Sequence, residues 1–195
     1  MNMKQIHANV ICAVIFLLTS LQVQAMQIKG VKIEEATQVG GSSLVLNGAG
    51  VRTKMMFKVY VAALYLGQKQ TEANAIISDH SNKRITLHFL REVSSDMLLH
   101  GMDEGFAANN TIAEMAAIEP QLREFRKLMA SAKEVKEGDE ILLDFMPTFT
   151  QFSYNGRVMG KIESEAFDQA LLRVWLGAHA VDSSLKRALL GQMED

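Results

Sequence analysis

The segment from Lys54 to Gly67, KMMFKVYVAALYLG, is apolar at nearly every position and constrains the fold more than any other part of the chain. A run of this kind is either a strand that is covered on both faces or a buried helix. Its β-branched and aromatic residues, such as Val59, Tyr60 and Val61, favour a strand, as do the glycines that flank it. The sequence therefore predicts a central strand with protein on both of its faces.

The remaining segments alternate between blocks of strands and blocks of helices. We expect strands at 31–39, 44–48 and 83–92, helices at 94–106 and from 120 onward, strands within 139–162, and helices at 164–177 and from 182 or 183 onward. The Asn155-Gly156 pair predicts a hairpin between Phe149–Tyr154 and Arg157–Ile162. Segregated blocks are typical of the α+β class, with a large antiparallel sheet and helices layered on one face. Residues 26–195 are expected to form one domain.

The first 25 residues have the composition of a secretory signal peptide. Lys4 precedes an apolar run from Val10 to Leu21, and the small residues Val23 and Ala25 follow at the positions that a signal peptidase reads. The run is short for a membrane span. We therefore expect cleavage after Ala25, export to the periplasm and no integral membrane span in the mature chain; an uncleaved anchor is the alternative.

Several classes of chemistry find no support in the sequence. The only cysteine, Cys12, lies in the expected signal, so the mature chain has no disulfide and no thiol nucleophile. The histidines are scattered, and no nucleophile elbow, P-loop or dinucleotide fingerprint is present. The formal net charge of -2 gives no basic stripe for nucleic acid. We expect no catalytic residues, metal, cofactor or nucleic-acid partner.

Two separated motifs carry a family resemblance. NGAGVR followed by FKVYVAALYL resembles the chalcone isomerase-like family, and Ala170–Gly191 is similar to the family's C-terminal helix and the segment after it. REVSSDMLLHGMDEGF aligns with the family's middle helical region, so the resemblance extends over Val31–Gly191. It implies an α+β fold with an apolar cleft between sheet and helices. Some family members cyclise chalcones to flavanones, and others are non-catalytic and bind fatty acids or assist related proteins.

The resemblance also assigns roles to single residues. Arg52 matches the arginine that follows the glycine motif, and Tyr60 stands where the enzymes have a threonine. Met97, Glu104 and Val174 stand in place of the enzymes' tyrosine, asparagine and late hydroxyl residue. The polar set of the enzymes is therefore incomplete, and the pair of Arg52 and Tyr60 resembles the carboxylate clamp of the fatty-acid-binding members.

The chemistry of these residues fits an apolar carboxylate such as a fatty acid. Arginine presents a planar fork that matches a carboxylate, and methionines such as Met97 and Met102 suit an adaptable apolar lining. The glycines of GAGVR are expected to form a turn that lets the backbone approach a ligand. The expected ligand-binding residues are Arg52, Tyr60, Met97 and Met102. Each residue also has a simpler interpretation. Arg52 is then a strand end in water, Tyr60 is an ordinary half-buried strand tyrosine, and the methionines fill the core.

One geometric condition limits the clamp. On a straight strand, the eight steps between Arg52 and Tyr60 extend over roughly 26 Å, which one carboxylate does not bridge. Either a bend or hairpin lies near Thr53–Met56, or only one of the two residues binds.

Two other functions stay open: a chalcone isomerase-type intramolecular lyase and an interaction module with a vestigial cleft. The sequence leaves the oligomeric state and the natural ligand undetermined.

Overall fold

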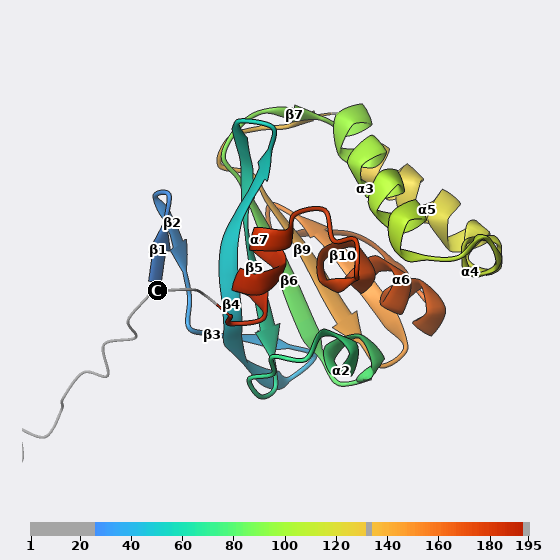
Figure 1. The fold of residues 1–195 in the computed structure, drawn as a ribbon, viewed down its shortest axis with the longest axis horizontal. Helices are drawn as coiled ribbons and strands as arrows, with labels where there is room; N and C mark the ends of the chain where they lie inside the picture. Colours follow the sequence, from blue (N-terminus) through green and yellow to red (C-terminus); the bar gives the residue numbers. More distant parts are fainter. Residues whose placement is uncertain (1–25, 132–133, 193–195) are drawn as a thin grey trace, which may run out of the picture.

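A computed structural model describes residues 26–131 and 134–192, which form a large antiparallel sheet with helices layered against one face (Figure 1). The expected α+β class is confirmed. The sheet has seven strands in the order β11-β10-β9-β6-β5-β4-β3. Its strands are β3 (Ala36–Val39), β4 (Ser42–Lys54), β5 (Phe57–Leu66), β6 (Lys83–Phe89), β9 (Glu140–Met146), β10 (Phe149–Tyr154) and β11 (Arg157–Ile162). The expected signal peptide lies outside the described residues.

The helices enclose the main core against the sheet. They are α2 (Ala73–Ser78), α3 (Ser95–Asn109), α4 (Ile112–Ala117), α5 (Glu119–Ala130), α6 (Glu165–Leu176) and α7 (Ser183–Leu189). Phe106, Phe125, Phe152 and Phe167 form an aromatic cluster in this core, with ring centroids 5.4–6.4 Å apart. No helix in the described part of the chain has the length and apolar character needed to cross a membrane.

Strand β5 is covered on both faces, as its sequence predicts. Tyr60 and Leu64 point into the main core, whereas Val61 and Tyr65 belong to a second, smaller cluster on the opposite face. This second cluster is covered by a small hairpin that the sequence analysis did not identify. Its strands, β1 (Met26–Ile28) and β2 (Val31–Ile33), pair with each other and place Ile33 in the cluster.

The expectation of a turn at the GAGVR glycines is wrong, because these glycines lie within strand β4. The strand continues through Gly48 and Gly50 to Lys54 because these glycines give room for helix α7. A Cβ at Gly48 would lie 2.0 Å from the carbonyl oxygen of Ala188, and a Cβ at Gly50 would lie 2.6 Å from the Ala188 Cβ. The two glycines therefore serve close packing of a helix on the sheet.

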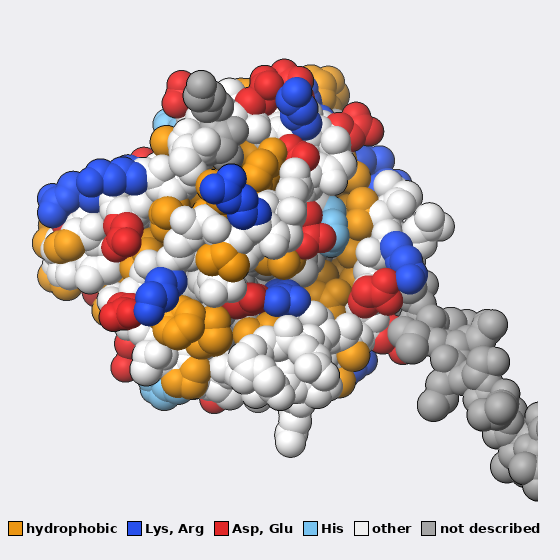
Figure 2. Space-filling view, turned by 180° about the vertical axis from the view of Figure 1, so that it is seen from behind, with side chains coloured by type: hydrophobic (Ala, Val, Ile, Leu, Met, Phe, Trp, Pro, Cys, Tyr) orange, Lys and Arg blue, Asp and Glu red, His pale blue; other side chains and the backbone are white. Residues whose placement is uncertain are grey.

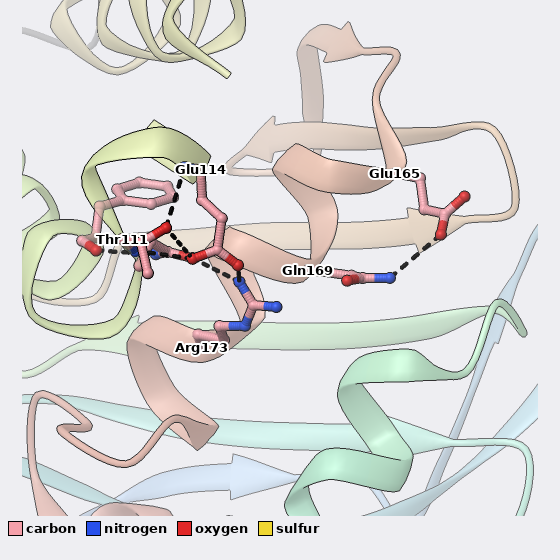
Figure 3. Close-up of polar contacts among 7 residues, drawn as sticks. Thr111, Glu114, Glu165, Gln169 and Arg173 are labelled. Atoms are coloured by element: carbon pink, nitrogen blue, oxygen red, sulfur yellow. Dashed lines mark hydrogen bonds and ion pairs between the residues drawn. The ribbon is translucent and has the colours of Figure 1, made fainter. Parts of the chain in front are cut away.

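Polar contacts join the helices to each other at the edge of the layer. Thr111 and Glu114 form a capping box at the start of α4. Arg173 of α6 donates to Asn110 and forms an ion pair with Glu114 at 3.1 Å (Figure 3). On α6, Ser164 caps the N-terminus by accepting from the Phe167 backbone N–H. These contacts fix α6 against the α3–α4 connection.

On the face of the molecule opposite the view of Figure 1, acidic and basic side chains are interspersed (Figure 2). That face has no continuous basic stripe of the kind that a polyanion would require.

Candidate functional site

Arg52 and Tyr60 are direct partners across the β4–β5 hairpin. The two strands are joined by the two-residue turn Met55–Met56, and Arg52 pairs with Tyr60 in the register. The guanidinium carbon of Arg52 lies 5.5 Å from the centroid of the Tyr60 ring. Of the two alternatives that the sequence left open, the structure has the hairpin near Thr53–Met56, and it brings together two residues that a straight strand would separate.

A cleft of about 340 Å³ opens beside this hairpin. This volume lies near the lower end of the range for small-molecule pockets, roughly 300–1,000 Å³. The β4–β5 turn, strand β7 (Val93–Ser94) and the start of α3 lie at the same end of the molecule (Figure 1). The cleft is lined by residues of these elements and of the loop before β7: Arg52, Lys54, Met55, Phe57, Val59, Arg91, Glu92, Val93, Met97, Leu98 and His100.

Arg52 lies at the half-buried end of the cleft and has one buried donor without a partner. Its Nε atom is buried and has no hydrogen-bond partner. Within residues 26–131 and 134–192, no carboxylate forms an ion pair with its guanidinium. A Cβ at Gly101 of α3 would lie only 3.5 Å from Nη2, so the missing side chain leaves room for the guanidinium. A buried donor without an acceptor costs about 1–3 kcal/mol, which an anion in the cleft would offset.

Tyr60 lies behind Arg52, in the main core rather than in the lining of the cleft. Only 2% of the residue is exposed, and its hydroxyl oxygen accepts from Trp175 Nε1 at 3.0 Å. Burial raises the pKa of the phenol, and the nearby positive charge of Arg52 partly opposes this rise. The phenol therefore keeps its proton at neutral pH. Among the hydrogen bonds of the described residues, that proton has no acceptor.

The structure separates the two methionines that were expected in the site. Met97 lies exposed at the mouth of the cleft, whereas Met102 is buried in the main core and does not line it. Arg91 and Phe57 are among the lining residues that the sequence analysis did not single out. Arg91 lies over the ring of Phe57, with its guanidinium carbon 4.4 Å from the centroid. Only the tertiary fold brings Arg91 to Phe57.

The residues that stand in place of the enzymes' polar set have other contacts. Glu104 forms an ion pair with Lys54 at 3.4 Å, and one of its carboxylate oxygens lies 3.2 Å from Nε2 of His100. Val174 is fully buried against Gly105, where a Cβ would lie 2.8 Å from its Cγ1. In the part of the chain that the structure describes, no group of three or more His, Cys, Asp or Glu residues is placed to hold a metal ion.

Comparison with known proteins identifies the family. A family model described as chalcone isomerase-like matches residues 25–191, so the chain belongs to the chalcone isomerase-like family. Among solved structures, the chain is similar to the fatty-acid binding protein AtFAP1 of Arabidopsis thaliana, with a TM-score of 0.66 and 15% sequence identity. The match covers 86% of this chain and 96% of AtFAP1, and it shows that the two share a fold. A comparison with curated protein sequences gives no match.

Proposed function

We propose that this chalcone isomerase-like protein binds an apolar carboxylate, most simply a fatty acid, in the cleft beside the β4–β5 hairpin. The observation that carries the proposal is the Arg52 guanidinium, which has a buried, unmatched Nε at the inner end of a largely apolar cleft. The similarity of fold to a fatty-acid binding protein supports it. Arg52 is the partner of the carboxylate, and the alkyl chain extends along Val59, Leu98 and Met97 toward the mouth.

The two parts of such a ligand contribute differently. Each buried methylene contributes about 0.8 kcal/mol before the costs of association, so the alkyl chain sets the affinity. A hydrogen bond to a charged group contributes about 1.5–3 kcal/mol, so Arg52 selects acids over neutral lipids. Tyr60 positions Arg52, since its ring supports the guanidinium from behind. Met102 contributes to the core that supports Leu98 and the rest of α3.

The test compares an acid with the matching alcohol. We expect Arg52→Ala to weaken the binding of palmitic acid by about 10- to 150-fold, the equivalent of one charge-assisted bond. Hexadecanol should bind both proteins alike, because it offers no charge. Arg91→Ala is the matched control, since Arg91 also lines the cleft but lies over Phe57. If Arg91→Ala loses the preference for the acid and a folded Arg52→Ala keeps it, Arg91 and not Arg52 is the partner.

The protein is not expected to cyclise chalcones. Glu104 is held in an ion pair and Val174 is buried, so neither supplies the donor that the enzymes have at the corresponding place. Loss of the chalcone absorption band at an enzyme-like rate, abolished by Arg52→Ala, would support an intramolecular lyase instead. An interaction module with a vestigial cleft would yield no fatty acid when the purified protein is extracted with organic solvent.

A further inference from the structure

We propose that the tip of the β4–β5 hairpin is a membrane-docking element that inserts into the surface of a bilayer containing anionic phospholipid. Three consecutive apolar residues form the tip: Met55 is 90% exposed, Met56 89% and Phe57 55%. Met55 and Phe57 also line the cleft, so the apolar tip is continuous with the proposed binding site. A lipid chain could therefore move between bilayer and cleft along an apolar path.

The backbone of the turn does not account for these methionines. Met55 has φ 57, in the left-handed region that favours glycine and asparagine. Another two-residue hairpin turn, between β10 and β11, has the preferred pair: Asn155 with φ 47 and Gly156 with φ 75. The β4–β5 turn thus combines an unfavourable residue for its conformation with a large exposed apolar surface. Unfavourable backbone conformations of this kind gather at functional sites.

Basic side chains surround the tip. Lys58 follows it, and the neighbouring amine of Lys29, from the β1–β2 turn, lowers the pKa of Lys58. Arg91 lies over Phe57. None of the three forms an ion pair with a residue of the described chain, whereas Lys54 pairs with Glu104 and Glu92 adds one acidic group at the rim.

Size and charge favour a bilayer over a protein as the partner. A stable protein interface buries about 800 Å² on each partner, and a narrow turn of three apolar residues offers far less. Insertion at the membrane surface needs only a small apolar group that enters the headgroup region and basic residues that face anionic lipid. The hairpin tip provides both. The docking proposal does not depend on the proposed function. Only the transfer of a fatty acid rests on the proposed function.

The test measures co-sedimentation with vesicles of phosphatidylcholine alone or mixed with phosphatidylglycerol. Protein is recovered from cells that express the full chain, and its N-terminus is read by mass spectrometry so that all variants are compared in one form. We expect the double variant Met55→Asn/Met56→Gly to bind mixed vesicles about tenfold or more weakly. Because asparagine suits the left-handed backbone of residue 55 better than methionine does, the variant should melt close to the temperature of the parent. Its matched control is Ile112→Ser, at a residue that is 91% exposed at the start of α4; this variant should bind like the parent.

The charge requirement has its own pair of variants. Lys58→Glu should weaken binding to mixed vesicles and leave the weaker binding to phosphatidylcholine unchanged. Lys69→Glu makes the same change in an exposed residue of the loop between β5 and α2 and should have no effect. The proposal is overturned if the parent binds neither vesicle, if Met55→Asn/Met56→Gly binds as the parent does, or if Ile112→Ser weakens binding as much as the tip variant.

A transfer assay separates docking from ligand binding. Met56 does not line the cleft, so Met56→Ser should bind palmitic acid in solution as tightly as the parent. It should take up a fluorescent fatty acid from mixed vesicles more slowly, because fewer molecules are docked. A parent that docks on vesicles but binds no fatty acid in solution would refute the proposed function and leave the docking element standing. Equal uptake rates for parent and Met56→Ser would refute the coupling of docking to transfer.

Discussion

Replacing Tyr60 with phenylalanine tests whether the core behind the cleft depends on one buried hydrogen bond. The Tyr60 hydroxyl accepts from Trp175 Nε1 at 3.0 Å, and both residues are buried in the main core. Tyr60→Phe removes the acceptor and leaves a buried indole N–H without a partner. An unmatched buried donor costs about 1–3 kcal/mol. For a domain of this size, that loss corresponds to a fall of roughly 2–12 °C in melting temperature.

The assay has a built-in reporter because Trp175 is the only tryptophan. Urea titration followed by its fluorescence gives the free energy of unfolding of the parent and of Tyr60→Phe. Tyr154→Phe is the matched control: this tyrosine donates to Asp139 and is partly exposed, so water replaces the lost contact and the cost should be smaller. If Tyr60→Phe and the parent unfold at the same urea concentration, the bond contributes no net stability. The reasoning that unmatched donors at this site are costly would then be wrong.

Three further outcomes are expected. Gly48→Ala should destabilise the fold by about 1–3 kcal/mol or more in thermal melts, because its Cβ would lie 2.0 Å from the Ala188 carbonyl oxygen. Gly67→Ala, with no atom within 4 Å of a new Cβ, should change the melting temperature little. Burial raises the pKa of Asp168 to about 7, against the hydrogen bond from Thr150. Since this folded-state pKa exceeds the unfolded value, the contribution of Asp168 to stability is full below about pH 4 and is lost as pH rises toward 7. Urea titrations should therefore show that Asp168→Asn reduces the fall in stability between about pH 4 and pH 7. At pH 8 this variant should be more stable than the parent by at most about 4 kcal/mol. A parent whose stability does not fall between these pH values would contradict the argument. We also propose export across the inner membrane to the periplasm: mass spectrometry of the exported protein should find Met26 as the first residue, and an extracytoplasmic form that still carries Met1 would refute cleavage.

The long elements are predictable from the sequence because their periodicity is strong. The unbroken apolar run of β5 requires protein on both faces, and the structure confirms this. What covers the second face is not predictable. Strands β1 and β2 have three residues each, too few to show an alternating pattern, and their sequence does not say that Ile33 packs beneath Val61.

The glycines of β4 and the turn after it were difficult to interpret for a related reason. Glycine usually indicates a turn, but Gly48 and Gly50 lie within a strand because a helix far along the chain packs on them. Met55 and Met56 form a turn although methionine is not one of the usual turn residues. A hairpin came in instead as one of two alternatives raised by the distance between Arg52 and Tyr60, and the fold has this hairpin.

The position of Arg52 follows from where β5 enters the core. Phe57 and Lys58 are exposed, and from Val59 onward the strand is buried. Arg52 pairs with Tyr60 just inside this boundary, so its guanidinium has the tyrosine ring on one side and the cleft on the other. On our proposals, a carboxylate binds at this inner end and its alkyl chain points toward the exposed tip. A fatty acid in a bilayer has its carboxylate at the surface and its chain in the interior. With the tip inserted, the carboxylate would therefore enter the cleft first and reach Arg52 while the chain leaves the bilayer behind it, so that no large apolar surface crosses water.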